Sequence, residues 1–528
     1  MRRFTLMVGT VVAVVGMLLP ASTASAKPQA PRVPPLLQFF RQHGYLPING
    51  VKDFNNAKAY AARWAAQHHT SAASAAGPNA PTIGASWAGI SDPSVAPPDP
   101  NGAIGPNSYI EIINLQIAIY TRAGVPISSA PLGVLTGHSQ FNLSDPMVLW
   151  DADTQRVYYN VWDVAQSTMA WGFSKDSNPL NIPSSFCNYT ASFGYNPSSD
   201  IPDYPKLGQT KTFLMIGVNH YPSFQAMHAD RSDLLWITKP QGSGPVSTCP
   251  PASNFSTGKF TNLKNQDGTQ AWTPVPAIQT DPSQTGYVVT SSDIECPDIC
   301  GTGTVITVHP FAQTPLGPRF GVQGKSLTVP AFQPPADAPQ SGTINTLDTL
   351  DGRLEHAVSG FDPRFNTLAI WTAHAVLGGA GSEVRWYEVT PTAIGPVLDQ
   401  SGTVTDSSLY VFNGAMSPDR TCILSGCSHG SAMVMGFSTS SSTTFPAAQM
   451  VSKVGAGAQS GMVLVHQSAS FDNDFTCGNH AQGCRWGDYG GATPDPAADP
   501  NAPNGEVWLT NEAVTSSLNT TWNWEAIP

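Results

Sequence analysis

Charged side chains are scarce in this sequence. Asp, Glu, Lys and Arg make up 12% of the 528 residues, against about 25% in an average globular protein. Acidic residues outnumber basic ones by 36 to 25, which gives a formal net charge of −11. Nucleic acids and anionic membranes both need a basic protein face, so neither is expected as a partner.

Long hydrophobic runs are missing after the first residues. Arg2 and Arg3 precede an apolar run from Leu6 to Leu19, and Ala24-Ser25-Ala26 offers the small residues that a signal peptidase reads. This pattern predicts a signal peptide over residues 1–26, and therefore a secreted, extracellular mature chain without a membrane span. A retained anchor is the alternative, although the run falls short of the about 20 apolar residues that cross a bilayer.

Signatures of several enzyme classes are also absent. The chain has no His-Glu-x-x-His zinc helix and no Gly-rich phosphate loop. The sialidase-type Asp-box, Ser-x-Asp-x-Gly-x-Thr-Trp, has its nearest counterpart in Asn265–Trp272, where Asp and Gly are adjacent. No reaction therefore follows from a single motif.

Cysteines are few and even in number. The eight are Cys187, Cys249, Cys296, Cys300, Cys422, Cys427, Cys477 and Cys484. The last six form three pairs that lie close in sequence, which in an exported protein predicts disulfide-closed loops and leaves Cys187 for Cys249. A thiolate metal site at Cys296 and Cys300 is the alternative, but it lacks a nearby His or second Cys pair.

No cofactor is expected, and calcium is the one metal that the composition leaves open. The residues concerned crowd one loop and are Asp495, Asp499, Asn501, Asn504 and Glu506. Carboxylate and amide oxygens are calcium ligands, but loops of this composition also occur without an ion.

What the chain has in plenty is Gly and Pro, 47 of each, as many short strands joined by turns require. Residues 27–82 differ: Ala57, Ala61 and Trp64 recur at helical spacing, and a Ser/Ala/Gly/Pro-rich linker follows. We expect a helical segment and linker over 27–82 and one main domain over 83–528. The helical segment is either a removable pro-piece or an ordinary packing helix.

The main domain repeats one unit seven times. The units open with PDPNGAIGPN, SDPMVLWDADTQ, IPDYPKLGQTKT, TPVPAIQTDPSQT, DGRLEHAVSGFDPRFN, LYVFNGAMSPDR and CRWGDYGGATPDP, and strands follow each opening. The strands are apolar nearly throughout, as in Ile110–Ile119, which is typical of sheets buried on both faces. The fold class predicted is all-β: a β-propeller of about seven four-stranded blades after a short helical segment. Six or eight blades, or stacked sandwiches, are the alternatives.

The same openings resemble those of uncharacterised secreted bacterial propeller proteins. The matching stretches, in order, are Pro98–Tyr109, Asp145–Val157, Asp203–Lys206, Asp351–Leu354, Val384–Glu388 and Arg485–Tyr489. Together they span most of residues 92–512. The resemblance implies an extracellular propeller related in architecture to sialidase-type repeat proteins, and it implies no particular reaction. The chain departs from the pattern at Asp99-Pro100-Asn101, at Leu354-Glu355-His356 and at Gly490.

Polar residues in these openings are the candidates for function, because openings of this kind line the channel of a propeller and its ligand-facing mouth. The predicted catalytic residues are Asp99, Asp203, Tyr204, Glu355, His356, Asp488 and Tyr489. The predicted substrate-binding residues are Asn101, Asp145, Lys206, Arg353 and Arg485.

These residue types suit chemistry on sugars. Hydrolysis of a glycosidic bond needs two carboxyls, one protonated and one ionised, whereas a lyase needs a base such as Tyr or His. Arginines clamp carboxylates, and Trp87, Trp150, Trp162, Trp171 and Trp486 are candidates for stacking on sugar rings. We therefore expect a monomer that binds or cleaves an extracellular polysaccharide or cell-surface glycan. A non-catalytic adhesion scaffold, in which these side chains only hold the ring together, remains the alternative.

Overall fold

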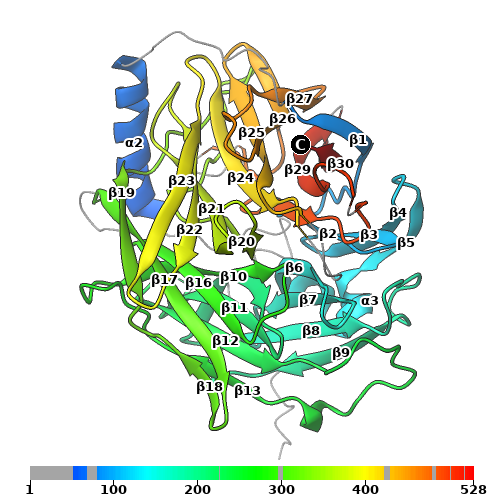
Figure 1. The fold of residues 1–528 in the computed structure, drawn as a ribbon. Coiled ribbons are helices and arrows are strands. Elements are labelled where there is room, and N and C mark those ends of the chain that lie inside the picture. Colours follow the sequence, from blue (N-terminus) through cyan, green and yellow to red (C-terminus); the bar gives the residue numbers. More distant parts are fainter. Residues whose placement is uncertain are drawn as a thin grey trace, which may run out of the picture.

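The seven units of the sequence form the seven blades of a β-propeller. The computed structural model describes residues 51–67, 80–224, 226, 228–294, 301–420, 428–477, 483–499, 501–515 and 518–528. The predicted fold class is therefore confirmed (Figure 1). The predicted signal peptide and two of the predicted cysteine pairs, Cys296 with Cys300 and Cys422 with Cys427, lie outside the described residues.

The first four blades follow chain order. Blade 1 has β2 (Asn101–Ile104), β3 (Ser108–Ile113), β4 (Gln116–Thr121) and β5 (Pro126–Pro131); blade 2 has β6 (Leu143–Asp151), β7 (Arg156–Asp163), β8 (Thr168–Ser174) and β9 (Phe186–Ala191); blade 3 has β10 (Ile201–Gln209), β11 (Phe213–Tyr221), β12 (Arg231–Thr238) and β13 (Thr257–Phe260); blade 4 has β14 (Ala271–Pro276), β16 (Thr285–Ser292), β17 (Gly303–Thr314), β18 (Gly317–Phe320) and β19 (Lys325–Phe332).

The other three blades complete the ring. Blade 5 has β20 (His356–Asp362), β21 (Thr367–Val376), β22 (Glu383–Pro391) and β23 (Pro396–Val404), with β15 (Ile278–Gln279) parallel to β20; blade 6 has β24 (Tyr410–Pro418), β25 (Ala432–Ser441), β26 (Thr444–Val454) and β27 (Val463–Gln467); blade 7 has β28 (Gly491–Pro494), β29 (Val507–Thr515), β30 (Leu518–Ile527) and β1 (Thr82–Ala88). The helical elements are α2 (Val51–Gln67), α3 (Leu132–Thr136), η1 (Gln140–Asn142) and η2 (Ala252–Asn254).

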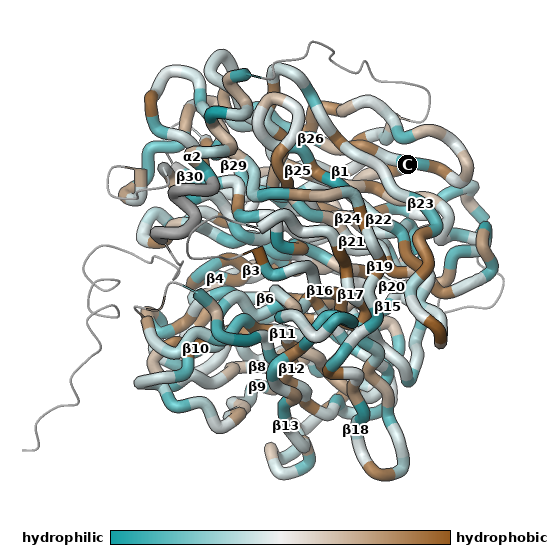
Figure 2. Tube along the Cα trace, turned by 90° about the vertical axis from the view of Figure 1, so that its left-hand side faces the viewer, coloured by the Kyte–Doolittle hydropathy of each residue, from teal (hydrophilic) through white to brown (hydrophobic). Residues whose placement is uncertain are grey.

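The strands are buried on both faces because each blade packs between two others. Every residue of β3, β6, β7, β10 and β11 is buried. Figure 2 shows hydrophobic stretches running through the strands inside the molecule. Trp162, Trp171 and Trp486 are at most 2% exposed and Trp150 is 4% exposed. They belong to the core and do not present a ring to a sugar, contrary to our expectation.

The ring is closed by strands from the two ends of the domain. β1 is the outermost strand of blade 7 and pairs antiparallel with β30, so the blue and red ribbons lie together in Figure 1. Trp87 of β1 packs edge-on against Tyr109 of blade 1 at 5.5 Å and against Trp508 of β29 at 5.9 Å, measured between ring centroids. Blade 7 is therefore incomplete without residues 82–88.

A distorted residue recurs on the innermost strands. Asp145, Tyr204 and Thr273 have φ near +50° and lie within bulges of β6, β10 and β14. Each precedes a proline, as does Asp99 (φ 50°) just before β2. Positive φ is uncommon for residues other than Gly, and a bulge re-aims the side chains near it. The repeat thus places a bulge at the start of successive inner strands.

Helix α2 packs on the outside of this ring. Ala61 and Ala65 are buried, and Ala61 contacts Ala336 and Leu377 of the propeller. Lys58 is 6% exposed and forms ion pairs with Asp337 at 2.8 Å and Asp348 at 3.6 Å. The segment that we expected to be helical is therefore anchored by a small apolar stripe and one buried cation.

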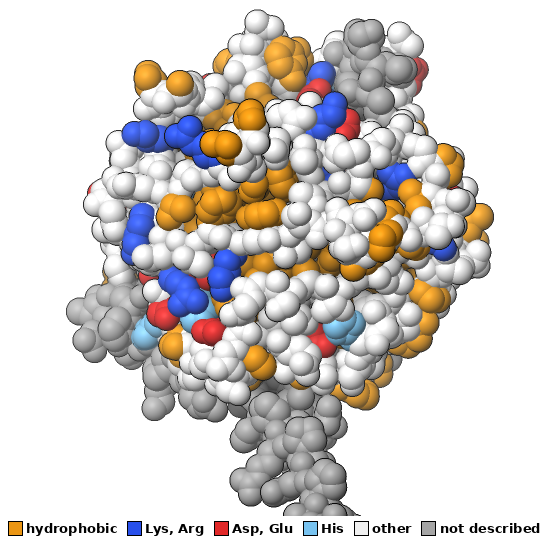
Figure 3. All heavy atoms as spheres, turned by 90° about the horizontal axis from the view of Figure 1, so that it is seen from below, with side chains coloured by type: hydrophobic (Ala, Val, Ile, Leu, Met, Phe, Trp, Pro, Cys, Tyr) orange, Lys and Arg blue, Asp and Glu red, His pale blue; other side chains and the backbone are white. Residues whose placement is uncertain are grey.

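The surface carries few charges, as the composition implies. Figure 3 shows one face on which hydrophobic side chains gather in the middle, while charged side chains form small groups toward the edges. None of the helices that the structure describes has the length and apolarity that a membrane crossing would need. Two of the predicted disulfides are present, Cys187–Cys249 and Cys477–Cys484.

Closure of the ring by β1 predicts a large difference in unfolding free energy between two truncated chains. A chain that begins at residue 90 lacks β1 and exposes the aromatic cluster around Trp508. A chain that begins at residue 80 keeps β1, and the cluster stays covered. We expect the shorter chain to lose at least about 3 kcal/mol of unfolding free energy relative to the longer one, the cost of removing a large packed aromatic side chain. Urea unfolding followed by tryptophan fluorescence measures this difference, and equal midpoints would contradict the closure.

Candidate functional site

The predicted site residues converge at one end of the central channel. Asn101, Asp145, Asp203, Tyr204, Lys206 and His356 lie on inner strands, and the others come from the connections just before them. We call this set the mouth cluster; its members are Asp99, Asp145, Asp203, Tyr204, Lys206, Arg353, Glu355, His356, Arg485, Asp488 and Tyr489. All of them are at most 4% exposed.

Asp99 joins blade 1 to blade 7. Its Oδ1 accepts the backbone N–H of Asp488 at 2.7 Å, and its Oδ2 accepts the Nδ2 of Asn114 at 2.7 Å. The Oδ1 of Asn114 in turn accepts the N–H of Asp145 in blade 2 at 2.8 Å. These bonds tie three blades together, so Asp99 holds neighbouring blades in place, and its catalytic role stays a prediction.

Two tyrosines complete the ties. The hydroxyl of Tyr489 donates to Oδ2 of Asp145 at 2.9 Å, and that of Tyr204 donates to the backbone oxygen of Asp488 at 2.8 Å. Burial, with carboxylates such as Asp145 near Tyr489 adding to it, holds the pKa of both tyrosines well above the usual value. Because a tyrosine acts as a base only when ionised, neither hydroxyl is suited to take a proton at neutral pH.

Both arginines are already paired with carboxylates. The Nε of Arg353 donates to Asp351 at 2.8 and 2.9 Å, and Arg485 pairs with Asp488 and, at 3.7 Å, with Asp348. Arg353 also stacks over the Tyr204 ring at 4.3 Å. Both guanidinium groups thus have carboxylate partners within the protein, and the binding of a substrate carboxylate by them stays a prediction.

Glu355, His356 and Asn101 also bond across strands and blades. Glu355 accepts the N–H groups of Ala375 (2.9 Å) and Gly414 (2.6 Å). The Nδ1 of His356 lies 3.0 Å from the backbone oxygen of Met416, and Oδ1 of Asn101 accepts the N–H of Val148 at 2.9 Å. Burial lowers the pKa of His356 to about 4, which leaves its ring neutral at pH 7.

Lys206 is the exception in the cluster. Its Nζ lies 3.6 Å from the centroid of the Tyr489 ring and 4.2 Å from that of Tyr204. This ammonium group forms no hydrogen bond or ion pair with any residue that the structure describes, although Lys206 is only 2% exposed. Burial lowers its pKa to about 7, with Glu355 and Asp488 opposing that effect. Lys206 is therefore a cation that releases its proton near neutral pH.

Carboxyl groups outnumber cations in the cluster, and this sets their protonation. Burial raises the pKa of Glu355 to about 7 and that of Asp488 to about 6. Burial, with the neighbouring carboxylates adding to it, also holds the pKa of Asp99 and Asp203 well above the usual value. At neutral pH the mouth cluster thus holds several protons that exposed carboxyls would have lost.

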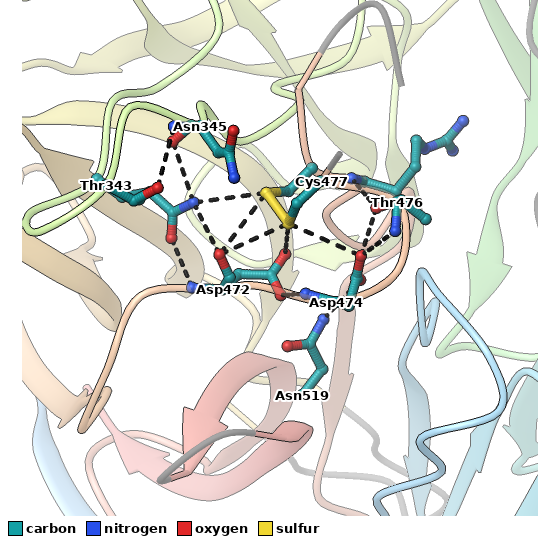
Figure 4. The surroundings of a disulfide bond; sticks show 10 residues. Thr343, Asn345, Asp472, Asp474, Thr476, Cys477 and Asn519 are labelled. Atoms are coloured by element: carbon teal, nitrogen blue, oxygen red, sulfur yellow. Dashed lines mark hydrogen bonds between the residues drawn. A yellow bond between two sulfur atoms is a disulfide. The ribbon is translucent and has the colours of Figure 1, made fainter. Parts of the chain in front are cut away.

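Two long connections meet at this end of the channel and pair with each other. Residues 333–355 precede β20 and residues 468–490 precede β28; the N–H of Asp348 donates to the oxygen of Cys484 at 2.9 Å, and Gln340 exchanges hydrogen bonds with Asp472. Figure 4 shows Asp472 and Asp474 turned toward the Cys477–Cys484 disulfide, with Asn519 of β30 bound to Asp474. The mouth cluster is thus enclosed by bonded chain.

Sequence reasoning missed several members of this network. Asn114 and Asn219 are buried and accept an N–H of the next blade's inner strand, from Asp145 and Thr273 respectively. Asp348 and Asp351 hold the two arginines. The only sequence signal for Asn114 and Asn219 was an Asn at the end of an apolar strand. The opening DGRLEH contains both Asp351 and Arg353, but nothing in it indicates that they pair.

The loop for which the composition left calcium open does not gather all of its residues. Asp495, Glu506 and Glu525 place carboxylate oxygens within 4.8 Å of one another. However, Arg122 bonds to both oxygens of Asp495, and Trp508 donates to one of them. Asp499 and Asn501 bond to each other instead, so a guanidinium already supplies the positive charge at this place.

Comparison with known proteins gives resemblances in overall shape only. No family sequence model and no curated protein matches the chain. A protein of unknown function from Dyadobacter fermentans aligns over 85% of this chain and 99% of its own, with 8% identity and a TM-score of 0.38. An exo-1,5-alpha-L-arabinanase from a bovine ruminal metagenomic library covers 57% and 96%, with 13% identity and a TM-score of 0.29. An alpha-L-arabinofuranosidase from Lactobacillus brevis covers 61% and 90%, with 11% identity and a TM-score of 0.30.

The buried carboxyl of Glu355 predicts a pH dependence of stability. Because its folded pKa of about 7 exceeds the ordinary 4.5, the stabilisation is complete below pH 4.5 and is lost as pH rises through 7. At about 1.4 kcal/mol per pKa unit, the loss is on the order of 3 kcal/mol. Lys206 acts oppositely, since its lowered pKa makes stability rise from about pH 7 toward 10.5.

We expect the variant Glu355→Gln to flatten the fall in unfolding free energy between pH 4.5 and 7. Urea unfolding at stepped pH measures the slope. The matched control is Glu383→Gln. Glu383 lies on β22 of the same blade and pairs with Arg385 at 3.0 Å, and its replacement should leave the slope unchanged. An unchanged slope in Glu355→Gln would show that another group carries the effect.

Proposed function

We propose that this chain is an extracellular propeller that binds a polysaccharide at the channel mouth and cleaves it by acid–base chemistry. The observation that carries the proposal is Lys206, a buried lysine without an ion pair whose pKa lies at about 7. Strongly displaced pKa values gather at catalytic sites, where a base must be poised near the working pH. The disulfides and the resemblance to secreted bacterial propeller proteins support an extracellular setting.

The residues divide into a base and an acid. Lys206, half deprotonated at neutral pH, takes a proton from the carbon next to a uronate carboxyl. A carbon–carbon double bond forms as the bond from the sugar ring to the glycosidic oxygen breaks, and Glu355, half protonated, donates its proton to that leaving oxygen. This pair favours elimination in an acidic polysaccharide, the reaction of a lyase. If water attacks instead, Glu355 serves as the acid and Asp488, with a pKa of about 6, as the base, which is the two-carboxyl pattern of a glycoside hydrolase.

Access to the mouth cluster requires the two covering connections to move. The route for such a movement runs through Asp348, which pairs with Arg485 of the cluster and with Lys58 of helix α2. A helix that holds one of these connections also controls how easily the mouth opens. This agrees with a pro-piece, the role that the sequence left open for the helical segment.

Screening the purified protein against plant, microbial and host glycans tests the proposed reaction. Assays of reducing ends and of unsaturated uronates separate hydrolysis from elimination. We expect Lys206→Met to lower turnover at least about 100-fold, as loss of a general base does, while Lys211→Met, an exposed lysine after the same inner strand, keeps it. Asp203→Asn and Asp488→Asn should weaken binding. Full activity in Lys206→Met would refute the assignment.

Removal of α2 is expected to raise activity. A chain that begins at residue 80 lacks Lys58, so Asp348 and the connection that it anchors lose one ion pair. The initial rate on the substrate found in the screen, compared between the full chain and this truncation, measures the effect. Lys58→Met in the full chain should show part of the same gain. Equal rates in all three chains would mean that α2 is only a packing helix.

A second candidate function is a non-catalytic binding or adhesion scaffold, and the enclosure of the mouth cluster favours it. Leu316, Ile344 and Ile394 are more than 90% exposed at loop positions. Next to Ile394, a cavity of about 300 Å³ between blades 4 and 5 is lined by Tyr287, Val308, Pro310, Pro391, Thr392 and Pro396, among others. Glycan or cell-surface binding that survives Lys206→Met but is lost when the three aliphatic residues become Ser would select this function.

A further inference from the structure

Blade 2 carries a second set of reactive side chains, independent of the mouth cluster. His138 lies between α3 and η1, Asp163 ends β7, and Thr190 lies on β9. The Nδ1 of His138 is 2.6 Å from Oδ2 of Asp163, and its Nε2 is 2.7 Å from Oγ1 of Thr190. A carboxylate, an imidazole and a hydroxyl thus form one hydrogen-bonded chain.

The proton positions in this chain follow from the partners. The Oδ1 of Asp163 accepts the N–H groups of Ala165 at 3.1 Å and Gln166 at 3.2 Å, which fixes the carboxylate and leaves Oδ2 for His138. A carboxylate only accepts, so Nδ1 of a neutral His138 donates, and its Nε2 is the acceptor for the Thr190 hydroxyl. This is the arrangement in which an imidazole removes a proton from a hydroxyl.

The exposure of the three residues suits a nucleophile at the surface. The Asp163 side chain is 4% exposed, that of His138 is 15% exposed, and Thr190 is exposed to solvent. β9 is the outermost strand of its blade, and no strand in the described chain pairs with its other edge. Every second N–H of such a strand points away from the sheet, where it is available to a developing oxyanion.

We propose that Asp163, His138 and Thr190 form a triad that cleaves esters of small acyl groups. The chain order imidazole, carboxylate, hydroxyl is one of the orders known for triads. Such sites are recognised by geometry and roles, and both distances fall within the reach expected of a nucleophile, its base and the group that orients the base. A threonine methyl group crowds the attacking oxygen, so a short acyl chain on an exposed carrier is the substrate class that fits.

The reaction balances without a further reagent. Oγ1 of Thr190 attacks the ester carbonyl carbon while Nε2 of His138 takes the hydroxyl proton. The tetrahedral intermediate expels the alcohol, which leaves with the proton from His138, and Thr190 carries the acyl group. Water then attacks the acyl-threonine, His138 takes a proton from the water, and the acid departs as the proton returns to Thr190.

p-Nitrophenyl acetate tests this inference on the full chain. We expect release of p-nitrophenol and, after acid quenching, an acetyl group on the peptide that contains Thr190, detected by mass spectrometry. Thr190→Ala should lower the rate at least about 100-fold and abolish the adduct, whereas Thr190→Ser should retain both. Thr190→Ala removes one exposed hydroxyl, so its thermal unfolding should match that of the unaltered chain.

The matched control is Thr257→Ala, an exposed threonine on β13, the outermost strand of blade 3. It should leave rate and adduct unchanged. Asp163→Asn tests the orientation of the imidazole and should slow the acylation. The inference is overturned if Thr190 carries no acetyl group, or if Thr190→Ala releases p-nitrophenol as fast as the unaltered chain. Because the triad and the mouth cluster lie on different parts of the fold, neither result depends on the proposed polysaccharide chemistry.

Discussion

Charge at the centre of the propeller has to be neutralised where water does not reach it. The channel mouth collects carboxyls from several blades, and a buried carboxylate is stable only if it is paired, accepts hydrogen bonds or keeps a proton. All three solutions occur: Asp351 pairs with Arg353, Asp99 accepts two donors, and Glu355 keeps a proton up to about pH 7. The inter-blade ties, the enclosed mouth and the state of Lys206 all follow from this constraint.

The same residues therefore hold the ring and offer chemistry. Asp99 and Glu355 each accept an N–H from another blade, so their replacement weakens the ring as well as the site. Lys206 differs, because its ammonium group contacts the faces of Tyr204 and Tyr489 and forms no hydrogen bond within the described part of the chain. A cation held by aromatic rings is the member of the cluster whose removal separates function from structure most cleanly.

The sequence repeat made the propeller fold and the convergence of its carboxyl groups predictable. Asp99, Asp145, Asp203 and Asp488 stand in the openings of different units, and in a ring of blades these openings meet around one axis, as they do here. The pairing Cys187–Cys249 was also predicted and is present. The sequence could not show that Arg485 pairs with Asp348, because that partner comes from another connection whose path depends on the whole ring. The closure of the ring by β1 likewise could not be predicted, and neither could the hydrogen bonds that link Asp163, His138 and Thr190. Both depend on contacts between distant segments, and no local sequence pattern indicates them.

The titration of Lys206 tests the account most directly. Lysines labelled at Cε give one NMR signal each, and comparison with Lys206→Met assigns the signal of interest. The account predicts that this signal titrates near pH 7. A Lys206 that stays protonated to pH 10 would contradict the account, because a fully charged lysine has no pair of electrons with which to take a proton.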